Sequence, residues 1–131
     1  MKILKYSIRI VPVLLLMGTI FFLSHQPGTK LQLPYIVGLD KLVHGFMYAA
    51  LAATMLYAAP RKALLLKPWR TGALIVLFCL VYGMTDEYHQ SFIPGRVPSF
   101  GDIIADVIGA SLLVYVWLRY QSPGLAPAPS S

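Results

Sequence analysis

Four apolar stretches, each close to the length of a membrane-crossing helix, constrain the fold of this sequence more than any other feature. They cover approximately residues 6–23, 42–59, 71–91 and 101–120. A helix needs about 20 apolar residues to cross a hydrocarbon core of about 30 Å, so each stretch is long enough for one crossing. We therefore predict an all-α polytopic membrane protein built as a four-transmembrane-helix bundle.

Composition supports this prediction and bounds the domain organisation. Hydrophobic residues make up 57% of the 131 residues and charged residues only 12%, against about a quarter charged in soluble domains. A soluble domain this small has too much surface to hide so many apolar side chains. We expect one domain over residues 1–121 and a disordered Pro/Ala/Ser tail over 122–131. The first stretch lacks a small-residue cleavage site, which favours an uncleaved span over a signal peptide.

The basic residues predict the orientation of the spans. Lys and Arg in short flanking segments are retained on the cytoplasmic side. One set of flanks holds Lys2, Lys5, Arg9, Arg61, Lys62, Lys67, Arg70 and Arg119, and the other holds Lys30, Lys41 and Arg96. We expect both termini in the cytoplasm, residues 24–40 and 91–101 outside, and a multi-pass protein of the bacterial cytoplasmic (inner) membrane. The net charge of +6 is spread between the spans rather than over one face, so nucleic acid is not an expected partner.

The acidic and histidine side chains gather at the predicted outer ends of the helices. They are Asp40, Asp86, Glu87, Asp102 and Asp106, together with His25, His44 and His89. A charge deep in a span costs at least about 2.5–3.5 kcal/mol on insertion scales, so such groups face a bundle interior or a wet cavity. The sequence therefore predicts a polar pocket that opens to the outside.

Spacing predicts that three helices contribute to this pocket. Residues four apart share a helical face, and three such sets occur: Asp40 with His44 and Tyr48, Asp86 with Gln90, and Asp102 with Asp106. Each set lies within about one or two turns of a helix end. We expect the three faces to point toward one another.

Two local features complete the predicted helices. Ala105 and Gly109 form a step of small residues that permits close approach of a neighbouring backbone. Asp40 and Asp102 stand where they could cap the second and fourth helices by accepting unpaired N–H groups.

The two outer loops share a pattern. Residues 25–28 read His-Gln-Pro-Gly and precede Asp40-x-x-x-His44, and His89-Gln90 followed by Pro94-Gly95 precedes Asp102-x-x-x-Asp106. We hypothesise two helical hairpins of common plan, related by an axis along the membrane normal.

These residues resemble the VanZ-like family of membrane proteins. The matching patterns are Asp40-Lys41-x-x-His44-x-x-x-Tyr48 and Asp86-Glu87-x-x-Gln90-x-x-x-Pro94-x-Arg96-x-x-Ser99-x-x-Asp102, followed by Gly109. The resemblance implies a cell-envelope context, because the namesake is associated with resistance to the glycopeptide teicoplanin. Asp106 stands where that family is expected to carry Asn. A protonated Asp106 would imitate the donor role of the amide.

The candidate site contains Asp40, Lys41, His44, Tyr48, Asp86, Glu87, Gln90, Arg96, Ser99, Asp102 and Asp106, with His25, Gln26 and His89 as additional members. Three uses stay open. In a structural network, Arg96 would pair with Asp86, Glu87 or Asp102. In a lipid-binding site, Arg96 and Lys41 would hold the phosphate of a membrane lipid or lipid-linked envelope precursor.

The third use is metal-assisted chemistry on a lipid phosphate, with Asp, Glu and His as ligands. No strong zinc or phosphatase signature accompanies these residues, so neither a metal nor another cofactor is expected, and catalysis is left unassigned. Proton-coupled transport is disfavoured because the cytoplasmic halves of the spans offer no polar relay. A bundle of four helices leaves room for a homo-oligomer.

Overall fold

The computed structural model describes residues 2–28 and 38–121. Over these residues the chain is helical, with no strand. The elements are α1 Lys2–Ser24, α2 Leu39–Ala58, α3 Arg61–Leu66, α4 Pro68–Gln90 and α5 Phe100–Gln121. The all-α prediction is therefore confirmed for the described part of the chain. The predicted disordered tail at 122–131 and the central part of the first outer loop lie outside it.

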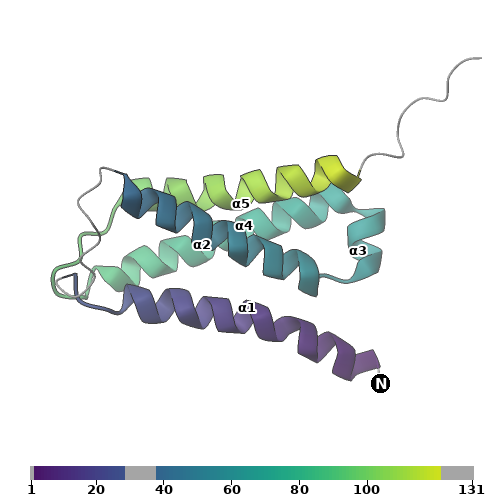
Figure 1. Ribbon diagram of the computed structural model, residues 1–131, viewed down its shortest axis with the longest axis horizontal. Helices are drawn as coiled ribbons and strands as arrows, with labels where there is room; N and C mark the ends of the chain where they lie inside the picture. The colour runs from purple at the N-terminus through teal and green to yellow at the C-terminus, as the bar shows by residue number, and fades with distance from the viewer. Residues whose placement is uncertain (1, 29–37, 122–131) are drawn as a thin grey trace, which may run out of the picture.

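The four long helices lie side by side along the long axis of the molecule, and α3 joins α2 to α4 at one end (Figure 1). α2 contacts α1, α4 and α5, and α5 also packs on α4. At the end away from α3, α1 and α4 finish while α2 and α5 begin. We call this end of the bundle the polar end.

Among the residues that the structure describes, three helices are long and apolar enough to cross a membrane: the segment Ser7–Ser24 of α1, α4 Pro68–Gln90 and α5 Phe100–Gln121. They support a membrane protein. α2 does not join them on hydropathy, because its first turns carry Asp40, Lys41 and His44. Hydropathy therefore supports three crossings and does not clearly support the predicted fourth, although α2 is present as the fourth long helix of the bundle.

The apolar core occupies the middle of the bundle and the half nearer α3. Its buried members are Ile20 and Tyr48, which lie nearer the polar end, and Leu51, Ala52, Leu56, Ile75, Cys79, Ala110, Val114 and Leu118. Many large apolar side chains face outward instead, such as Leu15, Phe46, Leu77 and Leu112. A bundle with a small apolar core and an apolar exterior is suited to a lipid environment.

α2 and α5 approach each other most closely at glycine residues. A Cβ atom added to Gly109 would overlap the carbonyl oxygen of Gly45, and one added to Gly45 would lie 3.3 Å from the carbonyl oxygen of Ala105. The predicted close approach at Ala105 and Gly109 is confirmed, and the neighbouring backbone is that of α2.

The prediction that Asp40 and Asp102 cap their helices is wrong. α2 is preceded by Gly38, which has a φ of 84° and supplies no side-chain cap. Ser99 precedes α5 and its Oγ accepts the Gly101 N–H at 3.1 Å. Both aspartates lie in the first turn of a helix, where their charge complements the helix dipole without capping it.

Candidate functional site

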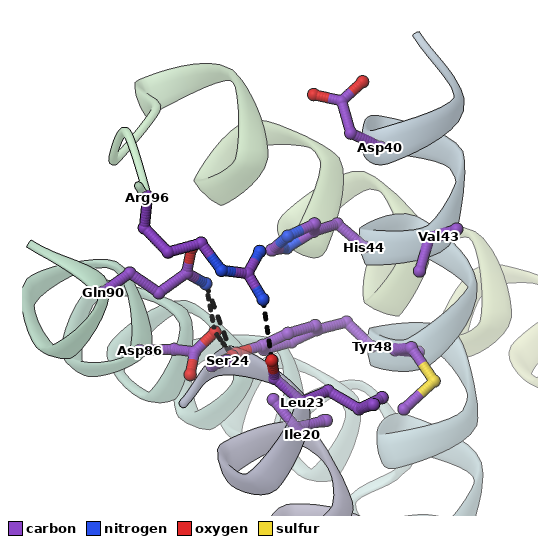
Figure 2. A pocket seen from close by; sticks show the side chains of 11 residues that line it. Ile20, Leu23, Ser24, Asp40, Val43, His44, Tyr48, Asp86, Gln90 and Arg96 are labelled. Atoms are coloured by element: carbon purple, nitrogen blue, oxygen red, sulfur yellow. Dashed lines mark hydrogen bonds between the residues drawn. The ribbon is translucent and has the colours of Figure 1, made fainter. Parts of the chain in front are cut away.

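A pocket of about 290 Å³ opens at the polar end between α1, α2 and α4, beneath the loop that carries Arg96 (Figure 2). Its lining is mixed. The polar lining residues are Ser24, Asp40, His44, Tyr48, Asp86, Gln90 and Arg96, and the apolar ones are Ile20, Leu23, Val43 and Met47. The pocket therefore offers ionisable groups and an aliphatic wall to the same occupant.

Three buried side chains from α1 and α4 form the polar floor of this pocket. Ser24 Oγ donates to Asp86 Oδ2 at 2.7 Å, and Gln90 Nε2 donates to the same oxygen at 3.1 Å. Gln90 Nε2 also lies 3.3 Å from Ser24 Oγ. The predicted i, i+4 pairing of Asp86 with Gln90 is thus present. Ser24 was missed as a candidate, although it directly precedes His25 and Gln26 at the end of an apolar stretch.

Arg96 binds the end of α1 rather than a carboxylate. Its Nε donates to the carbonyl of Gln26 at 3.0 Å, and one terminal nitrogen donates to the carbonyl of Leu23 at 2.7 Å. The last carbonyls of a helix have no partner within the helix and attract cations. Among the described residues Arg96 forms no ion pair, so the predicted pairing with Asp86, Glu87 or Asp102 is wrong.

The two outer loops are joined through their backbones. The Gly28 N–H donates to the carbonyl of Pro94 at 3.3 Å. A Cβ atom on Gly28 would overlap the carbonyl oxygen of Gly95, so only glycine permits this approach. The contact holds the Arg96 loop against the end of α1 and so fixes one wall of the pocket.

Lys41 links the start of α2 to the start of α5. Its Nζ lies 2.8 Å from Asp40 Oδ2 and 2.8 Å from Asp102 Oδ1. Asp40 and Lys41 precede the predicted span over residues 42–59. The two carboxylates, Asp102 first, raise the pKa of Lys41, and the hydrogen bond from Lys41 lowers the pKa of Asp40. Lys41 therefore keeps its positive charge, which the two carboxylates balance.

His44 and Asp106 meet between α2 and α5. The His44 Nδ1 lies 3.1 Å from Asp106 Oδ1. Asp106 is fully buried, and its Oδ2 has no hydrogen-bond partner in the described part of the chain. That oxygen lies against Gly83 of α4, where a Cβ atom would come within 2.6 Å of it. A glycine at this position makes room for the carboxylate.

Glu87 connects α4 to the segment before α5. Its Oε2 accepts the Ser99 N–H at 2.7 Å, while its buried Oε1 has no hydrogen-bond partner. One ligand atom each of His44, Glu87 and Asp102 lies within 4.8 Å of the others, a spacing compatible with a shared metal ion. Tyr48 is also buried with an unpartnered hydroxyl, and it lines the pocket.

The predicted site residues fall into three places. The pocket is lined by Asp40, His44, Tyr48, Asp86, Gln90 and Arg96. A second group does not line the pocket but lies beside it, where α2, α4 and α5 meet, and its members contact one another or His44: Lys41, Glu87, Ser99, Asp102 and Asp106. His25 and His89 form a separate pair with their ring nitrogens 3.2 Å apart, and the ring of Phe21 stacks on His89. Gln26 contributes its backbone carbonyl to Arg96.

Comparison with known proteins assigns the chain to a family. The family model described as VanZ/LLP1 matches residues 9–121. The chain belongs to the VanZ/LLP1 family. The match covers α2 to α5 entirely and most of α1, so the resemblance drawn from the outer-end motifs is confirmed. No curated protein and no solved structure matches this VanZ/LLP1 chain.

Proposed function

We propose that this VanZ/LLP1 protein spans a bacterial cytoplasmic membrane four times, with both termini in the cytoplasm and the polar end outside. α2 supports a fourth span because it runs alongside the three apolar helices and contributes Tyr48, Leu51, Ala52 and Leu56 to the buried interior. Its polar residues are confined to the turns at the polar end, where a membrane-crossing helix tolerates them.

Cysteine labelling tests this topology. Val97→Cys and Lys62→Cys would be made separately in a Cys79→Ala background and treated in intact cells with a membrane-impermeant maleimide. Both native side chains are exposed. We expect labelling at position 97 in intact cells and at position 62 only after permeabilisation. Labelling at both positions in intact cells would mean that α4 does not cross, because α4 is the helix that separates them. Labelling at 62 alone would contradict the proposed topology and would mean either that α2 does not cross or that the orientation is inverse.

We further propose that the pocket binds the polar headgroup of a membrane lipid, with a lipid-linked envelope precursor as the favoured class. One observation carries this proposal: Arg96 and His44 line the same pocket as Ile20, Val43 and Met47. This combination of polar and apolar lining suits an amphiphile, because its headgroup requires polar partners and the adjoining chain requires an apolar wall.

Arg96 is suited to hold an anion. A guanidinium group has five N–H donors, and the carbonyls of Leu23 and Gln26 engage two of its nitrogens. No carboxylate of the described residues neutralises it. In Figure 2 the guanidinium extends across the pocket toward His44. A phosphate at this point would receive the charge-assisted hydrogen bonds that arginine gives best.

The remaining polar lining suits a sugar or peptide portion of the headgroup. The Tyr48 hydroxyl is buried without a hydrogen-bond partner, and a buried hydroxyl in that state costs free energy that a ligand could recover. Asp40 is largely exposed at the rim and Asp86 is buried at the floor. Both can accept hydrogen bonds from ligand hydroxyl or amide groups.

A purely structural role is the second candidate. The Ser24, Asp86 and Gln90 bonds join α1 to α4, and Arg96 holds the end of α1. In that account the polar end would orient helices, and the pocket would hold bulk lipid. The two candidates differ in what the purified protein retains.

Lipid analysis by mass spectrometry distinguishes them. The full chain would be purified in mild detergent as wild type, as Arg96→Ala, and as Arg119→Ala, a matched control at the other end of α5. We expect one anionic lipid class enriched on the wild type and on Arg119→Ala, and at least tenfold less of it on Arg96→Ala. Bulk phospholipid carried equally by all three proteins would support the structural role instead.

We also propose an envelope role connected to glycopeptide resistance, which can be tested in cells with the same Arg96 variant. A strain lacking the protein would be complemented with the wild type or with Arg96→Ala, and teicoplanin susceptibility would be measured. We expect only the wild type to change susceptibility if the drug acts on the bound precursor. Equal effects of the two proteins would separate the pocket from resistance.

A further inference from the structure

Three side chains from three helices converge beside the pocket. His44 comes from α2, Glu87 from α4 and Asp102 from α5, and one ligand atom of each lies within 4.8 Å of the others. We infer that these residues bind a single divalent transition-metal ion, with Zn²⁺ or Mn²⁺ as the occupant. This inference does not depend on whether the pocket binds a headgroup.

The ligand set defines the class of ion. One imidazole nitrogen and two carboxylate oxygens suit Zn²⁺ and Mn²⁺. Mg²⁺ instead favours carboxylates, phosphates and several waters over imidazole. Three protein ligands also leave coordination positions for water or a ligand oxygen, as in catalytic rather than structural metal sites.

An unsatisfied oxygen provides an independent sign of a missing partner. Glu87 is 4% exposed, and its Oε1 has no hydrogen-bond partner within residues 2–28 and 38–121, whereas its Oε2 accepts the Ser99 N–H. A buried carboxylate oxygen without a donor or cation is costly. The Ser99 bond orients the carboxylate by one oxygen and leaves the other for coordination.

Asp106 occupies the position of a supporting residue. Its Oδ1 lies 3.1 Å from His44 Nδ1. When Nδ1 carries the proton and donates to Asp106, Nε2 is left as the ligand atom, which is the carboxylate–histidine–metal arrangement found in many metal sites. Asp106 is therefore a positioning residue: it fixes the tautomer and the ring orientation of His44 without coordinating the ion.

The charge balance of this region favours a cation. Glu87, Asp102 and Asp106 are all buried. Among the described residues, their only ion-pair partners are His44 and Lys41, and Lys41 is shared with Asp40. Several carboxylates held together in a low-dielectric interior require compensation. A divalent ion would supply two positive charges at the point where the carboxylates converge.

Metal titration of the purified full chain tests the inference. Protein in detergent would be stripped with chelator and titrated separately with Zn²⁺ and Mn²⁺. Bound metal would be measured by elemental analysis after gel filtration. We expect one ion per chain for at least one of the two metals, together with a rise in the melting temperature. A wild type that remains folded but retains no stoichiometric ion would overturn the proposal.

Substitutions assign the ligands. Glu87→Gln retains an oxygen for the Ser99 N–H but loses the charge, and Asp102→Asn is the parallel change on α5. We expect each to weaken metal binding at least tenfold. Asp106→Asn should weaken it about 10–100-fold, the usual cost of removing a supporting residue. The matched control is Asp86→Asn, a buried carboxylate one residue before Glu87 that belongs to the pocket floor.

The control also separates this inference from the proposed function. Asp86→Asn should retain the metal, and a loss equal to that of Glu87→Gln would contradict the assignment. A double variant that replaces both His25 and His89 tests whether the ion binds at that pair instead. Loss of metal binding in this double variant would overturn the proposed site. Conversely, absence of a specific lipid would leave the metal result intact, because the titration uses the ion alone.

A measurement on the wild type keeps the test valid if the variants fail to fold. X-ray absorption at the zinc edge should show one imidazole nitrogen among oxygen neighbours at about 2.0–2.2 Å. Sulfur in the first shell, or two or more imidazoles, would contradict the ligand set and overturn the proposal.

Discussion

The two halves of the same four helices are held together by different interactions. From the middle of the helices to the end at α3, the buried side chains are apolar, and Leu51, Cys79 and Ala110 at the middle are fully buried. At the polar end, the buried side chains include Ser24, Asp86, Glu87, Gln90, Asp102 and Asp106. Lipid tails are as apolar as leucine, so the apolar half packs through van der Waals contact between its side chains rather than through the hydrophobic effect.

This difference shows where function is to be sought. Buried ionisable groups are costly in a membrane and are retained mainly where they perform a task. The polar end also contains the pocket, the unpartnered oxygens of Glu87 and Asp106, and the unpartnered hydroxyl of Tyr48. Substitutions in the half nearer α3, the packing half, should therefore change stability, whereas substitutions at the polar end should change ligand binding.

The largest effect is expected at the crossing of α2 and α5, which both halves share. Gly109→Leu places a side chain where even a Cβ atom would overlap the Gly45 carbonyl, so we expect no folded protein. The yield of monodisperse protein in gel filtration is the readout. Gly18→Ala is the control, since nothing lies within 4 Å of its added Cβ atom. A well-folded Gly109→Leu protein would show that the helices do not cross as described.

A smaller effect is expected within the packing half. Leu51→Ala removes a fully buried side chain and leaves a cavity, at a cost of about 2–5 kcal/mol by analogy with soluble cores. We expect a lower melting temperature with unchanged lipid and metal binding. The control is Leu112→Ala, whose native side chain is 59% exposed. Loss of binding in a folded Leu51→Ala protein would mean that the halves are not separable.

The smallest effect on stability is expected at the polar end itself. A double-mutant cycle on Ser24→Ala and Asp86→Asn measures the coupling across the 2.7 Å hydrogen bond. Polar pairs between membrane helices average about 0.6 kcal/mol, so we expect a coupling of about that size by reversible unfolding in mixed micelles. A coupling above about 2 kcal/mol would support the structural role of the polar network.

Much of the fold could be predicted from the sequence because each span is a continuous apolar run. α4 and α5 begin and end within about three residues of the predicted spans. α3 was not anticipated, since its six residues are too few for a periodic pattern to show. The predicted fourth crossing corresponds to α2, whose hydropathy is lowered by Asp40, Lys41 and His44, which belong to the candidate site.

The candidate site could be predicted as a set of residues but not as an arrangement. Spacing placed Asp86 with Gln90 because a helix fixes that relation. Spacing could not show that Arg96 donates to the carbonyls of Leu23 and Gln26 rather than to a carboxylate. This contact depends on how the two outer loops meet at Gly28 and Gly95. Spacing also could not predict which Asp, Glu and His residues form the metal-compatible group, because its members come from three helices.

The repeated loop pattern stays a prediction, but the contacts agree with it. His25 meets its counterpart His89, Gly28 meets Gly95, and His44 meets its counterpart Asp106. Residues related by a two-fold axis meet their counterparts near that axis. Superposition of α1 and α2 on α4 and α5 with these residues matched would test the relation.

We propose that the polar end is a ligand site and not only a means of joining helices. Native mass spectrometry of the intact protein tests it most directly, by measuring the mass retained by the wild type, Arg96→Ala and Leu51→Ala. We predict that the wild type and the folded Leu51→Ala protein retain the same discrete added mass of a lipid, and that Arg96→Ala is folded but lacks this lipid mass. No discrete lipid mass on the wild type, or equal retention of it by Arg96→Ala, would contradict this proposal.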